Sequence, residues 1–243
     1  MSFPNKDLEV VFGIHPVLEL AKAKKRKISV VYTSNPAPKI FSQIANHLPS
    51  YVDVRPVSKM HLDKLAETPD HQNIVALASP LVIRKKFFDP AKQPFLVMLD
   101  GIQDPRNVGA IIRSAYCSSV SGVILSQKGS SPLTGTVNKS SAGLLEHSDI
   151  YIAASANAAV TELKNAGYKI FLATVDNSTP APKVDFTGPL CIVIGNEGSG
   201  ITKSILNSGQ HVSIPQRNDD ISYNASVAAG ILLFLAATQN KLI

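Results

Sequence analysis

The residues best suited to bind a ligand lie in a glycine-rich loop near the carboxyl end of the chain. The apolar run 190–194 breaks into Gly195-Asn-Glu-Gly198-Ser-Gly200, which is typical of a strand that enters a turn with exposed backbone groups. Glycine supplies φ freedom and lets N–H and C=O groups approach a ligand closely. Glu197 adds a carboxylate to the same loop. The pattern predicts a ligand-binding loop, and the alternative is an ordinary tight turn of an α/β domain.

Two common nucleotide-binding motifs do not fit this loop. The dinucleotide fingerprint is G-x-G-x-x-G after the first strand of a unit, whereas this loop reads G-x-x-G-x-G late in the chain. A P-loop has Gly-Lys followed by Ser or Thr, but Ile201 follows Gly200 and Lys203 is displaced. Neither type of phosphate-binding loop is therefore predicted.

A second polar stretch follows the loop. A short strand ends at Pro215, and a polar loop leads to the apolar segment 225–239. Ser222 and Asn224 precede this segment, and either side chain suits the N-cap of a helix. The pattern predicts a closing helix over 225–239.

A third group of candidates lies in the middle of the chain. The unbroken apolar run 95–99 predicts a buried strand, which ends at Asp100. A helix is predicted to begin at Asn107 and to carry Arg113. Taken alone, Asn107 would be an N-cap and Arg113 a surface residue.

Together these stretches resemble the three motifs of the SpoU-type RNA ribose 2′-O-methyltransferases, in the SPOUT superfamily. Residues 104–115 resemble motif 1, 192–201 motif 2 and 214–230 motif 3. Residues 11–19 and 71–76 are similar to the family's substrate-binding domain. The resemblance covers nearly the whole chain, and the subgroup that methylates a guanosine ribose of large-subunit (23S) ribosomal RNA is the most similar.

The resemblance implies transfer of a methyl group from S-adenosylmethionine to a ribose 2′-hydroxyl, without a metal. It assigns activation of the hydroxyl to Arg113. Because a guanidinium pKa exceeds about 12, we expect Arg113 to clamp the adjacent phosphate and stabilise the developing alkoxide rather than to act as a base. The implied catalytic residues are Arg113, Asn107, Glu197, Ser222 and Asn224.

The same resemblance implies two sets of binding residues. The cofactor set is Thr174, Gly195, Asn196, Gly198, Ile214, Pro215, Tyr223 and Ala225. The RNA set is His15, Lys24, Lys25, Arg26, His71 and Gln72. The chain departs from motif 3 at Gln216, Asn218, Tyr223 and Ala225, where the family usually has methionine, glycine, leucine and valine.

Composition describes a globular protein with an uneven charge distribution. Of the 243 residues, 44% are hydrophobic and 17% charged, as in folded domains. Residues 1–93 carry 14 Lys and Arg against 8 Asp and Glu, whereas residues 94–243 carry 10 of each. A basic part beside a neutral one favours contact between the basic part and a polyanion. The alternative is a merely soluble surface.

The pattern of strands and helices predicts an α/β fold in two domains. We expect an RNA-binding domain over 1–80, a linker over 81–93 and a methyltransferase domain with a parallel sheet over 94–243. The resemblance implies an L30e-like first domain, a carboxyl-terminal trefoil knot and a homodimer, which we expect to use the small residues of 225–230. Cys117 and Cys191 are predicted to be buried free thiols.

Three further interpretations bear on function and location. A non-catalytic RNA-binding protein would keep the basic first domain without binding S-adenosylmethionine, and a nucleotide-phosphate enzyme would use the glycine loop as a cradle. A transfer RNA is the alternative methyl acceptor. With no apolar signal core and no apolar run long enough to span a membrane, a cytoplasmic or organellar-matrix protein is expected.

Overall fold

The chain forms two compact units. The computed structural model describes residues 8–175, 178–217 and 221–243. The first unit comprises the chain up to Val82 together with Leu133–His147, and the second comprises Ile83–Pro132 and Ser148–Ile243. The predicted methyltransferase domain, 94–243, includes residues 133–147. The structure instead packs this segment with the amino-terminal part of the chain.

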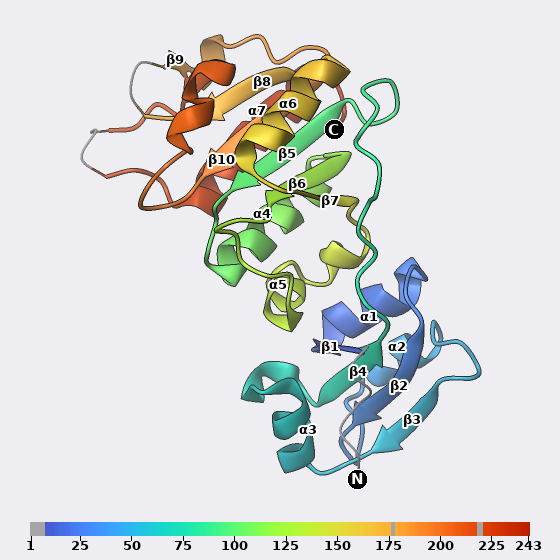
Figure 1. Ribbon diagram of the computed structural model, residues 1–243. Helices are drawn as coiled ribbons and strands as arrows, with labels where there is room; N and C mark the ends of the chain where they lie inside the picture. Colours follow the sequence, from blue (N-terminus) through green and yellow to red (C-terminus); the bar gives the residue numbers. More distant parts are fainter. Residues whose placement is uncertain (1–7, 176–177, 218–220) are drawn as a thin grey trace. The chain divides into compact units, whose positions relative to one another are not determined.

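The first unit is a four-stranded sheet with helices (Figure 1). Its elements are β1 (Glu9–Phe12), α1 (Ile14–Ala23), β2 (Ile28–Thr33), α2 (Phe41–Ala45), β3 (Asp53–Pro56), α3 (Lys59–Ala66), the 3-10 helix η1 (Pro69–His71), β4 (Ile74–Ala78), α5 (Gly135–Ser140) and the 3-10 helix η2 (Leu144–Glu146). The strand order is β1-β4-β2-β3. β4 pairs antiparallel with β1 and β2, and β3 pairs parallel with β2.

Residues 9–12 form the first strand of this sheet. Val11 pairs with Ala76 of β4 in the sheet. Gly13 then turns the chain with a φ of 100° and precedes α1, a backbone conformation that suits glycine. The apolar residues of 9–12 therefore serve the sheet, and the helical spacing begins only after Gly13.

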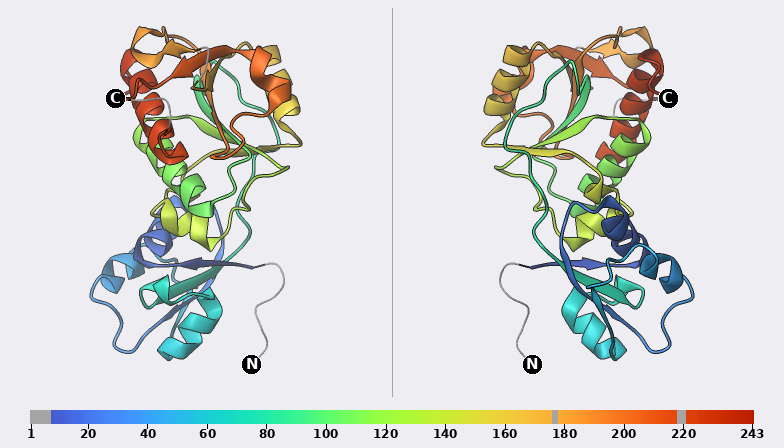
Figure 2. Two further views of the ribbon diagram at one scale, coloured as in Figure 1. Left: turned by 90° about the vertical axis from the view of Figure 1, so that its left-hand side faces the viewer. Right: turned by 90° about the vertical axis from the view of Figure 1, so that its right-hand side faces the viewer.

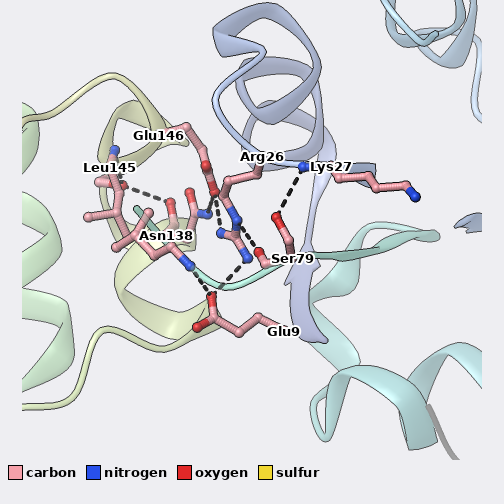
Figure 3. Close-up of polar contacts among 9 residues, drawn as sticks. Glu9, Arg26, Lys27, Ser79, Asn138, Leu145 and Glu146 are labelled. Atoms are coloured by element: carbon pink, nitrogen blue, oxygen red, sulfur yellow. Dashed lines mark hydrogen bonds and ion pairs between the residues drawn. The ribbon is translucent and has the colours of Figure 1, made fainter. Parts of the chain in front are cut away.

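A buried ion-pair network attaches residues 133–147 to the rest of the first unit (Figure 3). Arg26, whose side chain is 2% exposed, donates from Nη1 to Glu146 Oε1 at 2.9 Å and from Nη2 to Glu9 Oε2 at 2.8 Å. Its Nε donates to the Ser79 carbonyl oxygen at 2.6 Å. Asn138 Nδ2 donates to the same Glu146 oxygen at 2.6 Å. Burial raises the pKa of Glu146 despite Arg26 and Asn138, and the network makes segment 133–147 part of this unit.

The second unit contains a seven-stranded parallel sheet. Its elements are β5 (Phe95–Asp100), α4 (Pro105–Cys117), β6 (Gly122–Ser126), β7 (Ile150–Ala153), α6 (Ala156–Ala166), β8 (Lys169–Ala173), β9 (Thr179–Pro180), η3 (Ala181–Lys183), β10 (Leu190–Gly195), η4 (Lys203–Ser208), β11 (Gln210–Ser213) and α7 (Ala225–Gln239). The strand order is β7-β6-β5-β10-β8-β11-β9. The predicted α/β fold with a parallel sheet is confirmed. The trefoil knot stays a prediction.

Helices cover both faces of this sheet, with α6 on one side and α4 and α7 on the other (Figure 2). The late strand β10 pairs between the early strands β5 and β8, so that Gly195 lies opposite Asp100. β11 pairs with β8 on the next position outward. The carboxyl ends of β5, β10, β8 and β11 therefore meet at one edge, where parallel α/β sheets bind ligands.

The predicted linker is partly built into the second unit. Phe88 is 3% exposed and belongs to the core that contains Leu96 and Met98. Arg84 pairs with Asp149, at 3.0 Å between Nη1 and Oδ2, and its guanidinium lies 4.5 Å from the centroid of the Phe88 ring. Arg84 therefore has a structural role in this unit, beside a buried aromatic ring.

The small residues at the start of α7 are partly used for packing within the chain. Ala229 is fully buried, and a side chain added at Gly230 would meet Ser114 of α4 at 3.5 Å. Ala229 and Gly230 therefore pack α7 against α4 in the same protomer, while Val227 of the same stretch stays exposed. The prediction that residues 225–230 form the dimer contact stays a prediction. The exposed apolar side chains of the two helices are Tyr116, Val227 and Phe234.

The two cysteines are both free, and they differ in exposure. Cys191 is buried within β10, as predicted, but Cys117 at the end of α4 is exposed. The pattern of α4 accounts for the difference, because Cys117 follows the exposed Arg113 by four positions and shares its face. No helix in the described ranges has the length and apolar character that crossing a membrane requires.

Candidate cofactor cavity and active site

A cavity of about 960 Å³ lies at the carboxyl ends of the central strands of the second unit. Its volume is within the range of small-molecule sites, about 300–1,000 Å³. Its wall includes every residue of the predicted cofactor set: Thr174, Gly195, Asn196, Gly198, Ile214, Pro215, Tyr223 and Ala225. The structure thus brings together residues from three strand ends, the glycine loop and the start of α7.

The glycine loop is held in shape by the side chain of Asn196. Its Oδ1 accepts hydrogen bonds from the backbone nitrogens of Gly198 at 2.9 Å and Ser199 at 3.0 Å. Its Nδ2 donates to the Gly101 carbonyl oxygen at 2.8 Å. Both ends of the side-chain amide help to shape the loop, which leaves the second Nδ2 hydrogen of Asn196 and the backbone of this segment for a ligand.

Two of the three loop glycines are required, each for a different reason. A Cβ at Gly195 would lie 2.5 Å from the backbone of Gly200, so the returning chain leaves no room for a side chain. Gly200 has a φ of 67°, in the left-handed region that favours glycine. Gly198 has neither constraint, since its added Cβ would meet only Asn196 Oδ1 at 3.6 Å. Of the φ freedom predicted for these glycines, only Gly200 uses a positive φ.

Asp100 anchors the far end of the loop, a role that the sequence analysis missed. It is 3% exposed. Its carboxylate accepts from the backbone nitrogen of Thr202 at 2.7 Å and from the Thr202 hydroxyl at 3.1 Å. An aspartate at the end of an otherwise apolar strand was the available signal, because a buried carboxylate requires donors.

Three predicted catalytic residues meet at the mouth of the cavity. Asn107 Nδ2 donates to Glu197 Oε1 at 2.5 Å, and Asn224 Nδ2 donates to Asn107 Oδ1 at 3.3 Å. Asp104, not Asn107, caps α4, and Asn224 caps α7 by accepting from the Ser226 nitrogen. Asn107 is therefore free to join the other two motifs. Ser222 lines the same cavity.

Arg113 does not reach this cluster within one chain. It lies six residues after Asn107 on α4, which at 3.6 residues per turn is about 120° around the helix. Its side chain is exposed, it is not part of the cavity wall, and it has no hydrogen-bond or ion-pair partner among the described residues. Among the residues that the structure describes, no cationic side chain forms an ion pair with Glu197 in a single chain.

A histidine that the sequence analysis did not single out also lines the cavity. His211 on β11 is paired through Nδ1 with the Thr174 hydroxyl at 3.2 Å and through Nε2 with the Leu206 carbonyl oxygen at 2.7 Å. No sequence motif marks His211, since a lone histidine in a short strand is more often structural.

The motif 3 departures place polar and aromatic groups beside the cavity. Tyr223 is 44% exposed and lines it together with Gln216. The Gln216 Nε2 atom is buried and has no hydrogen-bond partner in the described part of the chain. Asn218 lies outside the described residues.

The predicted RNA-binding residues divide into exposed and structural ones. His15, Lys24 and Lys25 are exposed, and Lys25 Nζ donates to the His147 carbonyl oxygen at 3.0 Å. The prediction that Arg26 contacts RNA is wrong, because all three of its side-chain nitrogens donate hydrogen bonds within the buried network.

The remaining two candidates lie in the turn before β4. His71 is 1% exposed, with Nε2 at 2.9 Å from Asp63 Oδ1 and Nδ1 accepting from the Asn73 nitrogen. It is therefore a turn residue, and its prediction as an RNA contact is wrong. Gln72 is exposed, but its Oε1 accepts from the Ile14 nitrogen and from Lys139 Nζ. Burial lowers the pKa of Lys139.

Comparisons with known proteins identify the class of the chain. A family model described as the SpoU rRNA Methylase family matches residues 94–234, and one described as RNA 2′-O ribose methyltransferase substrate binding matches residues 10–82. The chain therefore belongs to the SpoU rRNA methylase family. The predicted resemblance is confirmed.

Curated relatives share this class. A putative TrmH family tRNA/rRNA methyltransferase of Staphylococcus haemolyticus is 36% identical over 188 residues, 74% of this chain and 75% of that protein. An uncharacterized tRNA/rRNA methyltransferase of Mycolicibacterium vanbaalenii is 30% identical over 97% of this chain and 78% of its own length.

Solved structures share the fold. A crystal structure of an RNA 2′-O ribose methyltransferase has a TM-score of 0.85 at 20% identity, and covers 98% of this chain and 90% of that chain. The SpoU methyltransferase AviRb from Streptomyces viridochromogenes, in complex with the cofactor AdoMet, has a TM-score of 0.78 at 22% identity, with 96% and 90% covered.

Proposed function

We propose that the chain transfers a methyl group from S-adenosylmethionine to a ribose 2′-hydroxyl of RNA. The observation that carries the proposal is the Asn107–Glu197–Asn224 cluster at the mouth of the cavity. Membership of the SpoU rRNA methylase family supports it. The finer proposal, from the resemblance alone, is a guanosine of large-subunit ribosomal RNA.

The cavity is suited to S-adenosylmethionine in size and in lining. Backbone groups of the loop 195–200 and of Ile214 and Tyr223 are available to the polar edges of the cofactor, and Leu232 and Ile194 provide apolar wall. The cofactor would supply an electrophilic methyl group on a sulfonium. Methyl transfer breaks the S–C bond, forms an O–C bond to the ribose and releases the hydroxyl proton.

The residues of the chain would bind and orient the acceptor. Arg113 would clamp the neighbouring phosphate and stabilise the developing alkoxide, and the proton would leave through that phosphate or water. Asn107 and Asn224 would hold the Glu197 carboxylate in a fixed position. This arrangement works by positioning and charge stabilisation, which suits a reaction without a metal.

A homodimer would explain why Arg113 points away from its own cavity. The exposed face of α4 carries Arg113 and Tyr116, and neighbouring α7 exposes Val227 and Phe234. Burying these apolar side chains against a second copy would remove them from water. Arg113 of one protomer would then complete the cavity of its partner. Within one chain, motif 1 already meets motifs 2 and 3 through Asn107, so only the arginine would act across the interface.

The RNA itself would be held by the first unit. Its match to a substrate-binding family and its exposed lysines, among them Lys24 and Lys27, support this proposal. A transfer RNA is the second candidate, because the curated relatives are named for both tRNA and rRNA.

The test uses the full chain with labelled S-adenosylmethionine and separate ribosomal and transfer RNA fractions. We expect the label to appear in ribosomal RNA. An RNA with a 2′-deoxy nucleotide at the target position should bind but accept no methyl group. If label appeared in transfer RNA alone, the substrate would be transfer RNA and not ribosomal RNA. If the deoxy substrate were methylated, the acceptor would be a base and not a ribose. Calorimetry with S-adenosylmethionine and with ATP separates the rivals, since a non-catalytic RNA-binding protein binds neither and a nucleotide-phosphate enzyme binds ATP.

A further inference from the structure

The cavity wall contains a histidine–threonine pair whose hydrogen-bond direction can be assigned. His211 Nε2 lies 2.7 Å from the Leu206 carbonyl oxygen, and Nδ1 lies 3.2 Å from Thr174 Oγ1. A carbonyl oxygen only accepts, so Nε2 carries the hydrogen. In the neutral ring Nδ1 is then an acceptor, and the Thr174 hydroxyl must donate to it.

This assignment fixes what Thr174 offers to a ligand. Its backbone is held in place because the Thr174 nitrogen donates to the Val212 carbonyl oxygen at 3.0 Å. Its hydroxyl hydrogen is committed to His211. A threonine hydroxyl has one donor and two acceptor sites, so only acceptor sites remain for the cavity that Thr174 and His211 line.

We propose that His211 is a positioning residue that holds the Thr174 hydroxyl as an acceptor for an N–H donor of the cofactor. The inference rests on the proposed function, since it places S-adenosylmethionine in this cavity. The cofactor has two such donors, the 6-amino group of adenine and the ammonium of its amino acid. His211 touches neither and acts through Thr174.

The matched variants separate the two hydrogen bonds of the imidazole. In His211→Asn the side-chain oxygen takes the place of Nδ1 and still accepts from Thr174, whereas in His211→Gln the side-chain nitrogen takes the place of Nε2 and keeps only the Leu206 contact. Calorimetry measures the affinity for S-adenosylhomocysteine at about pH 8. We expect His211→Gln to weaken binding about three- to tenfold, the value of one neutral hydrogen bond, and His211→Asn to stay within about twofold.

A double-mutant cycle tests whether His211 acts through the hydroxyl. Thr174→Val should weaken binding as much as His211→Gln, Thr174→Ser should not, and adding His211→Gln to Thr174→Val should have no further effect. Thermal unfolding without ligand checks that the variants remain folded. Equal losses for the Asn and Gln variants, or additive losses in the double variant, would overturn the inference. Absence of binding by the unmodified protein would instead overturn the proposed cofactor site and the inference with it.

Two analogues identify the donor. S-inosylhomocysteine has oxygen in place of the 6-amino group, and 5′-methylthioadenosine lacks the amino-acid ammonium. The penalty of Thr174→Val should vanish with the analogue that lacks the group that Thr174 accepts from. A penalty that persists with both analogues would show that Thr174 does not accept from an N–H donor, which would overturn the proposal.

Discussion

Asn107 donates a hydrogen bond to Glu197 across 90 positions of the sequence, with 2.5 Å between Nδ2 and Oε1. The same amide accepts from Asn224, so one side chain of α4 joins the glycine loop to the N-cap of α7. A side-chain amide can donate to a carboxylate from its nitrogen and accept from a second amide at its oxygen. Each of the three motifs contributes one member.

Replacing Asn107 tests this link. Asn107→Asp places a second carboxylate beside Glu197, so we expect methyl transfer to fall about tenfold to a hundredfold, the range for a lost hydrogen bond to a charged group. Asn107→Ala should cost less, because it removes the donor without adding repulsion. Gln103→Glu, at an exposed position just before α4, is the control for added charge. Single-turnover assays decide, and an Asn107→Asp enzyme of normal rate would remove the link from the mechanism.

Arg113→Ala should leave the affinity for S-adenosylmethionine nearly intact and lower methyl transfer by at least about a hundredfold, the scale for one lost transition-state stabiliser. Arg113→Lys should recover little, because lysine lacks the planar fork that spans two oxygens. Arg106→Ala, on the same exposed side of α4, is the matched control. Single-turnover assays measure the transfer, and calorimetry the affinity.

Mixing variants tests the proposed dimer. An Arg113→Ala chain supplies an intact cavity, and a Gly195→Ala chain supplies an intact arginine. If Arg113 works across the interface, mixing the two inactive proteins should restore part of the activity. No recovery, in a mixture shown by sedimentation to exchange subunits, would place Arg113 in its own chain's site.

The glycine loop offers a pair of substitutions with opposite expectations. Gly195→Ala puts a Cβ 2.5 Å from the Gly200 backbone, whereas Gly198→Ala meets nothing nearer than 3.6 Å. The first should distort the loop and abolish measurable binding of S-adenosylhomocysteine. The second should bind within about threefold of the unmodified protein, a change of less than one kcal/mol. Calorimetry measures both, and tight binding by Gly195→Ala would show that the loop adjusts freely.

Glu146 gives the first unit a distinct dependence on pH. Burial raises the pKa of Glu146 above its ordinary value of 4.5, so the folded state holds the proton more tightly than the unfolded state. The stability that this proton contributes is complete below pH 4.5 and is lost as the pH rises through the raised pKa. The unfolding free energy of the protein minus that of Glu146→Gln should therefore fall as the pH rises from about 4. Urea titrations at several pH values measure both free energies, and a value of this difference that rises with pH would contradict the assignment.

The exposed lysines at the end of α1 should carry phosphate contacts. Lys24→Ala should weaken RNA binding and reduce the slope of log affinity against log salt by about one unit, since one phosphate contact is lost. Lys169→Ala, in the second unit, is the control, because that lysine donates to the Thr187 carbonyl oxygen. Filter binding at several salt concentrations measures the slopes, and equal slopes would show that Lys24 makes no such contact.

The fold was predictable where a local pattern determined it. Unbroken apolar runs such as Phe95–Asp100 marked the buried parallel strands, and α7 begins and ends where its apolar segment does. The cavity residues were predictable from the motifs, because motif 2 and motif 3 lie at the ends of β10 and β11.

What the sequence could not indicate depends on partners distant along the chain. Arg26 reads as one member of a lysine-rich run, and only Glu146, 120 positions later, shows that it is buried. His71 was predicted to contact RNA, and only the positions of Asp63 and Asn73 show that both nitrogens of its imidazole have partners within the chain. His211 depends on Thr174 and Leu206 in the same way. Each error came from a polar side chain whose partner no spacing rule connects to it.

The discontinuity of the first unit has a consequence for synthesis on the ribosome. Its strands are complete at residue 78, but Arg26 lacks its buried partner Glu146 until residue 146 has left the exit tunnel. Until then Arg26 has only Glu9 and the Ser79 carbonyl oxygen as partners, and removing one partner of a buried charge pair is strongly unfavourable. The nascent unit should therefore wait, incompletely folded, while β5, α4 and β6 are being made. For the same reason, a chimera that exchanges residues 1–93 alone should misfold, whereas one that also carries 133–147 should be viable.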